Sequence, residues 1–537
     1  MATYRQAVQP TILQRPQSSK TQRGRSEYGD WQTNMDLALA VCRMLKEQGV
    51  RPKVIVEPTC GKGNFIIAAL QVFDSIEDVY AIEIHRPYIE ELNARLSKHL
   101  AGNPGLKKIN VNIYNKNIFD FNFSGIKDSI KGREILVLGN PPWVTNSGLG
   151  TMRSNNLPKK SNFKNARGLE AMTGKGNFDI AEYICLQMID LLSGEKAHLA
   201  LLMKNSVIKS IVQNQRQSRH RTSHISQYGI DAEKEFGVSV AASLLLMDFN
   251  GSVAERCQVS DFYTLKPLYE YGWINDKFVA DTALYQKFGG IDGLSPLKWW
   301  SGVKHDCAKV LELSSVDGRF VNGLGEPVDI EDDMVYPLVK SSDIKGDIIS
   351  STRKHIIMTQ KSVSDNTNYL KLSHPKTYKY LSEHSDYLDN RSSSIYRGRP
   401  RFCLFGVGDY SFKKYKVVVS GLYKSPRFSL ANMIGEKPAM LDDTCYSLGF
   451  DDFESAYVAQ SILNSGIVKD FIRSLLFVDA KRVVNKELLM RIDFGKIVER
   501  VSCEDLGIDR KMWDGFVGLL KSLSGPVQYS LFNCRSK

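Results

Sequence analysis

The stretch VIVEPTCGKGNF, residues 54–65, decides the fold class. Three β-branched residues predict a short buried strand, two glycines allow a tight turn, and the apolar run 65–73 predicts a helix. Similar short apolar runs alternate with stretches of helical periodicity further along the chain, at 79–82, 109–114, 135–138, 197–203 and 244–249. This alternation predicts an α/β fold with a doubly wound, mainly parallel sheet.

Two acidic residues beside the glycine turn indicate the kind of ligand. Glu57 ends the first strand, where open parallel sheets bind ligands, and a carboxylate there suits an ammonium better than a phosphate. Neither a phosphate loop nor GxGxxG is present. Glu83 ends the second strand, about 20 residues beyond the turn, where such sheets place an acid against ribose hydroxyls. The pattern predicts a nucleoside carrying an amino acid, which S-adenosyl-methionine fits; the alternative is a generic turn with a surface acid.

The tetrapeptide Asn140-Pro141-Pro142-Trp143 follows the strand predicted at 135–138 and so lies at the same edge of the sheet. Asn140 offers a side-chain carbonyl, and Pro141 offers a backbone carbonyl stiffened by two prolines. Two such acceptors can bind both hydrogens of an exocyclic amino group and aim its lone pair at a methyl donor. Trp143 offers a face on which a base can stack. The alternative is a proline-rich loop with a half-buried Trp.

These motifs resemble those of the amino-methyltransferases of DNA, in particular the adenine-N6 group with the cofactor motif first and the recognition domain last. The segment 30–34 resembles the family segment before the first helix, which closes over the methionine end of the cofactor, and Lys62 replaces a small residue of the family's cofactor loop. The segment 115–121 resembles the third cofactor motif, in which Asn117 stands where the family usually has Asp. The resemblance implies a Rossmann-like methyltransferase domain. It implies catalysis by Asn140, Pro141, Pro142 and Trp143, and cofactor contacts by Thr33, Glu57, Thr59, Gly61, Gly63, Glu83, Asn117, Ile118 and Asn140.

A second aromatic and a basic insert accompany these motifs. The segment 235–238 resembles the family segment that stacks on the target base opposite Trp143, which makes Phe236 the candidate; the alternative is a core phenylalanine. The insert 146–178 follows the catalytic loop and is rich in Asn, Lys and Gly. Its residues Lys159 and Lys160 are predicted to contact DNA; the alternative is a solvated loop.

The chain is predicted to have three parts: a basic flexible tail (1–28), a methyltransferase domain (29–265) and a mixed α+β domain (266–537). The last part resembles target-recognition domains, both at 335–342 and at 394–430, where basic residues interleave with aromatics. The predicted DNA contacts there are Arg397, Arg399, Lys413, Lys414 and Lys424.

Composition and charge are compatible with this interpretation. Of 537 residues, 42% are hydrophobic and 24% charged, as in an ordinary soluble protein. Lys and Arg number 71 against 59 Asp and Glu, and this net charge of +12 suits either nucleic acid or a plain solvated surface. No apolar run reaches the roughly 18–20 residues that cross a membrane, and the polar, basic N-terminus is not expected to be a signal peptide. Nine scattered cysteines without a CxxC pair predict free thiols in a reducing cytoplasm, and no metal site. The family resemblance implies that this cytoplasm is bacterial or archaeal and that the protein is associated with the nucleoid.

The sequence therefore predicts a site-specific DNA adenine-N6 methyltransferase that uses S-adenosyl-methionine and flips its target base out of the duplex. Its partners are double-stranded DNA and either a separate cognate restriction endonuclease or, for an orphan enzyme, none; no fused nuclease is expected. The alternatives are an RNA methyltransferase, a glutamine-modifying protein methyltransferase, a cytosine-N4 enzyme, and a DNA-binding protein with an inactive site.

Overall fold

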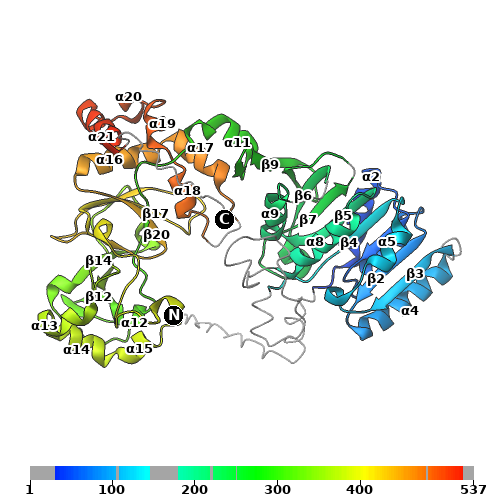
Figure 1. Cartoon of the computed structure of the whole chain (residues 1–537), viewed down its shortest axis with the longest axis horizontal. Helices are drawn as coiled ribbons and strands as arrows, with labels where there is room; N and C mark the ends of the chain where they lie inside the picture. The colour runs from blue at the N-terminus through cyan, green and yellow to red at the C-terminus, as the bar shows by residue number, and fades with distance from the viewer. Residues whose placement is uncertain are drawn as a thin grey trace, which may run out of the picture. The chain divides into compact units, whose positions relative to one another are not determined.

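The computed structural model describes residues 31–103, 108–145, 179–217, 222–249, 251–478 and 482–523. The chain divides into two compact units, the first ending at Asp276 and the second beginning at Lys277 (Figure 1). The predicted tail at 1–28 and the insert at 146–178, with Lys159 and Lys160, lie outside the described residues. No helix among the described residues is long and apolar enough to cross a membrane.

The first unit is built on one large sheet. Its strands are β1 (Val54–Glu57), β2 (Asp78–Glu83), β3 (Asn110–Asn115), β4 (Ile135–Gly139), β5 (Ala197–Lys204), β6 (His224–Ile230), β7 (Ala242–Phe249), β8 (Arg256–Asp261) and β9 (Pro267–Ile274). Its α-helices are α2 (Met35–Glu47), α3 (Asn64–Val72), α4 (Arg86–Gly102), α5 (Ser124–Ile130), α8 (Ile180–Leu192), α9 (Asn205–Asn214) and α10 (Ala232–Phe236), with the 3₁₀ helix η2 (Ile118–Asp120).

The strand order within this unit is β9-β8-β6-β7-β5-β4-β1-β2-β3 (Figure 1). Strands β3, β2, β1, β4 and β5 are parallel, whereas β7 is antiparallel to both β5 and β6. The chain winds outward in one direction from β1 and in the other from β4. This confirms the predicted doubly wound, mainly parallel sheet, and the crevice outside the ends of β1 and β4 is its switch point.

Burial explains why the central strands could be predicted from the sequence. Every residue of β1 and β4 is buried, because helices cover a parallel sheet and both faces of its strands must be apolar. Strands β6, β8 and β9 were not predicted. The predicted domain boundary after residue 265 falls in the turn between β8 and β9, which pair antiparallel.

The second unit holds two five-stranded sheets, of order β11-β20-β17-β18-β15 and β13-β12-β16-β14-β19. Its strands are β10 (Lys277–Val279), β11 (Trp300–Ser301), β12 (Glu312–Val316), β13 (Arg319–Val321), β14 (Val335–Val339), β15 (Ile348–Ile349), β16 (Lys354–Ile357), β17 (Tyr415–Ser420), β18 (Ser429–Ala431), β19 (Met440–Leu441) and β20 (Cys445–Phe450). Its α-helices are α11 (Thr282–Phe288), α12 (Ala308–Leu311), α13 (Leu370–Ser373), α14 (Pro375–Glu383), α15 (Ser385–Asp389), α16 (Phe453–Leu463), α17 (Gly466–Leu475), α18 (Lys486–Met490), α19 (Phe494–Val498), α20 (Cys503–Leu506) and α21 (Arg510–Leu523). This is the predicted mixed α+β architecture.

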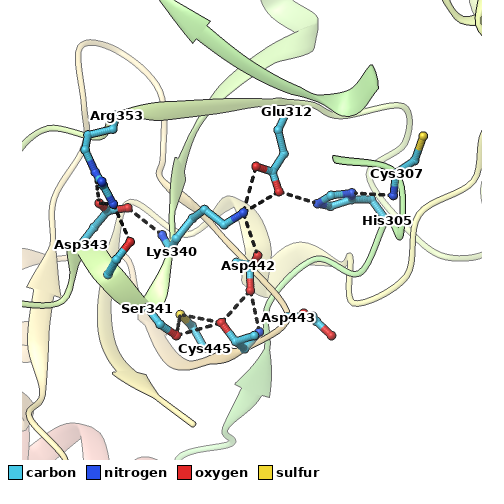
Figure 2. Close-up of polar contacts among 12 residues, drawn as sticks. His305, Cys307, Glu312, Lys340, Ser341, Asp343, Arg353, Asp442, Asp443 and Cys445 are labelled. Carbon is cyan, nitrogen blue, oxygen red and sulfur yellow. Dashed lines mark hydrogen bonds and ion pairs between the residues drawn. The ribbon is translucent and has the colours of Figure 1, made fainter. Parts of the chain in front are cut away.

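A polar network joins the two sheets of the second unit (Figure 2). Lys340, just after β14, donates to both carboxylate oxygens of Glu312 on β12, at 2.7 and 2.9 Å. Although burial alone would raise it, hydrogen bonds from His305 and Lys340 lower the pKa of Glu312 to about 2. The next residue, Ser341, accepts a hydrogen bond from Ser420 on β17 of the other sheet, at 2.9 Å. The segment 335–342, singled out in the sequence, therefore links the two sheets.

Candidate active site

The two motifs of the sequence meet at the switch point of the first sheet. Glu57 ends β1, Gly139 ends β4, and the two strands pair in parallel. A Cβ built on Gly139 would lie only 3.4 Å from Cγ of Glu57, and Gly139 has φ +151°, which a residue with a side chain rarely adopts. The backbone that leads into Asn140 therefore passes directly beside the buried acid.

The turn after β1 depends on its two glycines. Gly61 and Gly63 have φ of +51° and +76°, and a Cβ on Gly63 would meet Cδ1 of Leu92 at 2.1 Å. Gly63 is also the N-cap of α3, so the left-handed turn places the start of that helix at the crevice. Both residues are thus needed for the shape of the loop.

Glu83, at the end of β2, braces this glycine loop. Its Oε2 accepts a hydrogen bond from the Gly61 N–H at 2.8 Å, and its Oε1 accepts one from the His85 N–H at 2.7 Å. Glu83 is 9% exposed. The structure therefore gives Glu83 a role in holding the loop, and its contact with a ribose stays a prediction.

Several buried polar atoms around the crevice have no hydrogen-bond partner among the described residues. They include Oγ1 of Thr33, Oε2 of Glu57 and Oγ1 of Thr59. Burial, reinforced by the nearby carboxylate of Glu83, raises the pKa of Glu57 well above its usual range. Unpaired buried polar atoms destabilise a protein, so this group is suited to a ligand that brings a positive charge and hydrogen-bond donors. The ammonium of S-adenosyl-methionine has both.

The predicted cofactor residues Asn117 and Ile118 lie at the start of η2. The side-chain oxygen of Asn117 accepts a hydrogen bond from the Phe119 N–H at 3.1 Å and so begins the 3₁₀ turn. Ile118 is buried in a small apolar cluster with Ile82, Ile180 and Ile184. Asn117 therefore shapes the loop after β3, and contact of Asn117 or Ile118 with a cofactor stays a prediction.

The amide of Asn140 is held in one orientation. Its Nδ2 donates to the backbone oxygen of Trp31 at 2.8 Å. This fixes which end of the amide is the oxygen, and Oδ1 is buried without a hydrogen-bond partner among the described residues. Pro141 is buried and Pro142 is half-buried, so the loop is confined on the protein side. Asn140 thus presents an unused acceptor next to the Glu57 strand end.

The side chain of Trp143 is buried and is not a fully exposed surface for base stacking. It is 5% exposed, and its indole N–H donates to the Leu202 backbone oxygen at 3.1 Å, which anchors it to β5. The ring of Phe236 lies edge-on against it, with centroids 5.1 Å apart and an interplanar angle of 71°. The structure therefore brings together the two aromatics that the sequence analysis paired, although they lie about 90 residues apart. Stacking of either ring on a base stays a prediction.

A contact that the sequence analysis missed joins the segment before α2 to Glu235, the residue before Phe236. Nδ2 of Asn34 donates to Oε2 of Glu235 at 2.8 Å, and the Tyr263 hydroxyl donates to Oε1 at 2.9 Å. Burial and the neighbouring acids Glu235 and Asp231 raise the pKa of Tyr263 to about 12, so it remains a donor. The signal in the sequence is limited to the N-cap preference of Asn34 before α2.

The predicted DNA contacts of the second unit differ in their surroundings. Arg397, Lys414 and Lys424 are exposed, and none has an ion pair within the described ranges. Arg399 is also exposed, with its guanidinium 6.0 Å from the Phe405 ring. Lys413 is half-buried and pairs with Asp451 at 2.5 Å. The first four are thus better placed than Lys413 to meet phosphates.

The described residues contain no group of three or more His, Cys, Asp or Glu side chains that could hold a metal ion. The cysteines that the structure describes are all buried thiols: Cys42, Cys60, Cys185, Cys257, Cys307, Cys403, Cys445 and Cys503.

Comparison with known proteins finds a protein of similar sequence and several solved structures of low sequence identity. The chain is 39% identical over 469 residues to the Type II methyltransferase M.NspV of Nostoc sp. (strain ATCC 29411 / PCC 7524), covering 87% of this chain and 96% of that protein. No family model matches the chain.

Among solved structures, it is similar to the type IIL restriction-modification enzyme MmeI in complex with DNA (12% identity, TM-score 0.49, 87% of this chain and 64% of that one). It is also similar to the type IIG restriction endonuclease BpuSI (13% identity, TM-score 0.38, 93% and 62%). The chain spans less than two-thirds of either solved enzyme.

Proposed function

We propose that this chain, which belongs to the Type II methyltransferases, methylates the N6 amino group of an adenine at a specific site in double-stranded DNA. Methyltransferases of this kind generally use S-adenosyl-methionine. The observation that carries the proposal is the buried, unpartnered Oδ1 of Asn140, oriented by Trp31 and next to the strand end that carries Glu57.

The chemistry follows from the acceptors on the catalytic loop. The lone pair of an adenine amino group is delocalised into the ring, so the nitrogen is a weak nucleophile. Oδ1 of Asn140 and the backbone oxygen of Pro141 would accept its two hydrogens and draw the nitrogen toward a tetrahedral shape. The lone pair would then form the new N–C bond with the methyl group that the cofactor supplies as the methyl–sulfur bond breaks, and one amino proton would leave to water. Neither acceptor is a strong base, so catalysis rests on orientation and electrostatics.

The cofactor would be held by the residues around the glycine turn. We propose that Glu57 binds the ammonium of S-adenosyl-methionine, that Thr33 and Thr59 bind its polar groups, and that Glu83 faces the ribose. Bound there, the cofactor supplies an electrophilic methyl group on a sulfonium. Asn117 and Ile118 would border its adenine, while Gly61 and Gly63 let the backbone approach it. The unpartnered atoms of Thr33, Glu57 and Thr59 support this assignment.

The target adenine lies inside a duplex and must leave the base stack to reach this loop, at a cost of a few kcal/mol. Trp143 and Phe236 would receive it, since their rings already contact each other and Trp143 belongs to the same loop as Asn140. The exposed basic residues of the second unit would hold the flanking DNA through its phosphates. These residues are Arg397, Arg399, Lys414 and Lys424, with Lys413 more restrained by Asp451. A separate endonuclease that cuts the same unmodified sequence is the proposed partner in a restriction–modification system.

The experiment uses purified protein, DNA from a methylation-free host and S-adenosyl-methionine with a deuterated methyl group. Mass spectrometry of the digested nucleosides should show labelled N6-methyladenine, and the Asn140→Ala variant should show none while binding S-adenosyl-homocysteine as tightly as the wild type by calorimetry. Labelled N4-methylcytosine would replace the adenine assignment with the cytosine alternative. Loss of cofactor binding in Asn140→Ala would make Asn140 a cofactor ligand instead of a base ligand.

A further inference from the structure

Four successive residues at the start of the described chain each contact a different part of the site. The Trp31 backbone oxygen holds the amide of Asn140. Gln32 accepts a hydrogen bond from the Lys62 N–H of the glycine loop at 3.3 Å. The next two residues continue the pattern, so we name the segment 31–34 the latch.

The second half of the latch, Thr33 and Asn34, contacts the start of α3 and the helix α10, which ends at Phe236. The Thr33 backbone oxygen accepts from Asn64, the first residue of α3, at 2.6 Å, and its hydroxyl is one of the unpartnered buried atoms. Asn34 uses both ends of its side chain: Oδ1 caps α2 at the Leu37 N–H (2.7 Å), and Nδ2 donates to Glu235. Position 34 therefore ties the latch to α10.

Glu235 immediately precedes Phe236, the ring that contacts Trp143. Its two carboxylate oxygens are shared between the latch (Asn34) and the turn after β8 (Tyr263). The contacts form a closed path from Asn140 through the latch and Glu235 to Phe236, and through Trp143 back to the catalytic loop. A change in the latch can thus reach the aromatic ring without passing through the cofactor.

We propose that Glu235 is a positioning residue that couples the cofactor-binding latch to the base pocket. The inference rests on the proposed function of this site. Because Glu235 lies outside the group of residues assigned to the cofactor, it does not set cofactor affinity by itself. It transmits the ordering of the latch to Phe236, so that bound cofactor strengthens binding of DNA and, by reciprocity, DNA strengthens binding of cofactor.

The test exchanges donor and acceptor between the two side chains. Asn34→Asp keeps a good N-cap for α2 but sets two carboxylates against each other. Glu235→Gln removes the charge and one acceptor. In the double variant, the amide introduced at position 235 can donate to the carboxylate introduced at position 34, so the hydrogen bond is restored in reverse. Glu233→Gln, an exposed position on the same helix, is the matched control for loss of charge.

The measured quantity is the coupling factor, the ratio of the DNA dissociation constants without and with S-adenosyl-homocysteine. The duplex carries the sequence found methylated in host DNA. Loss of one exposed, charge-assisted hydrogen bond should lower this factor about three- to tenfold in each single variant. The Glu235→Gln variant should bind S-adenosyl-homocysteine alone within about twofold of wild type. The double variant should recover most of the factor, and Glu233→Gln should match wild type.

An unchanged coupling factor in Glu235→Gln, or a double variant no better than the weaker single variant, would overturn the proposal. An equal loss in Glu233→Gln would also overturn it, since charge alone would then explain the effect. The coupling factor is a binding measurement and does not depend on which base is methylated. Failure of the adenine assignment would therefore leave the result of this test unchanged.

Discussion

Replacing Glu57 by Gln should weaken cofactor binding while stabilising the cofactor-free protein. Glu57 is 2% exposed, its Oε2 has no hydrogen-bond partner among the described residues, and burial raises its pKa well above the usual range. Its folded-state pKa therefore exceeds its unfolded-state pKa, so the ionised form destabilises the fold as the pH rises through the folded-state value. The neutral amide removes this penalty, and the Tm of the cofactor-free variant should rise at neutral pH.

The loss of affinity can be sized from the interaction that is removed. A hydrogen bond to a charged group contributes about 1.5–3 kcal/mol, which corresponds to roughly a 10- to 150-fold higher dissociation constant for S-adenosyl-homocysteine. In the wild type, the cationic amine favours ionised Glu57, so binding releases a proton. Below the raised pKa of Glu57, the dissociation constant should therefore increase about tenfold for each unit by which the pH falls. The variant should lose this pH dependence.

Calorimetry across a pH series and thermal unfolding without cofactor provide the two readouts. Glu47→Gln, an exposed change of the same charge at the end of α2, is the control and should alter neither. If Glu57→Gln bound the cofactor as tightly as wild type with the same pH dependence, Glu57 would not hold the ammonium. A lower Tm in the cofactor-free variant would show that the carboxylate is stabilised by the fold, contrary to the electrostatic reasoning.

Three further predictions concern the loop, the second unit and DNA. Gly63→Ala should lower the free energy of unfolding, measured with denaturant, by about 2–4 kcal/mol, because a methyl group at φ +76° meets Leu92. Gly132 has a similar φ of +70°, but a methyl group there would have no atom within 4 Å. Gly132→Ala should therefore cost only about 1 kcal/mol. Lys340→Met should lower the free energy of unfolding of the second unit by about 2–3 kcal/mol. This loss is smaller than for a fully buried pair because the Lys340 side chain is 32% exposed. Lys345→Met should leave the stability of the unit unchanged. Since the pKa of Glu312 is lowered to about 2, its stabilisation should be present above about pH 4.5 and fade as the pH falls toward 2, measured by unfolding across that range. Lys414→Ala with Lys424→Ala should reduce the slope of log affinity for DNA against log salt by about 0.9 for each phosphate that the protein no longer neutralises, whereas Lys413→Ala, already paired with Asp451, should change it less.

The parts of the fold that were predictable are those where burial acts on both faces of a strand. β1 and β4 read as continuous apolar runs because helices cover the sheet, and the glycine turn after β1 indicated the ligand edge. β6 was not predicted as a strand because two of its three buried residues, Ser226 and Gln227, are polar. Gln227 donates to Ser243 on β7 and accepts from Tyr271 on β9, so neighbours distant in sequence satisfy it.

The candidate site was likewise predictable where local sequence motifs define it, and not where contacts between distant residues do. Asn140, Glu57 and Gly63 stand in local motifs whose chemistry can be read residue by residue. The Asn34–Glu235 contact joins residues 201 positions apart, and no local pattern encodes it. The burial of Trp143 depends on a carbonyl of β5, which the sequence alone does not place against the catalytic loop. Short strands explain why the sequence predicted a mixed second unit but not the order of its two sheets.

Long-read sequencing of DNA from a methylation-free host that expresses the chain tests the central claim most directly. The Asn140→Ala variant, expressed to the same level, serves as its control. The proposed chemistry predicts N6-methylated adenine at one short recurring motif with the wild type and unmodified DNA with the variant. Unmodified DNA from a folded, cofactor-binding wild type, or equal methylation with Asn140→Ala, would contradict it.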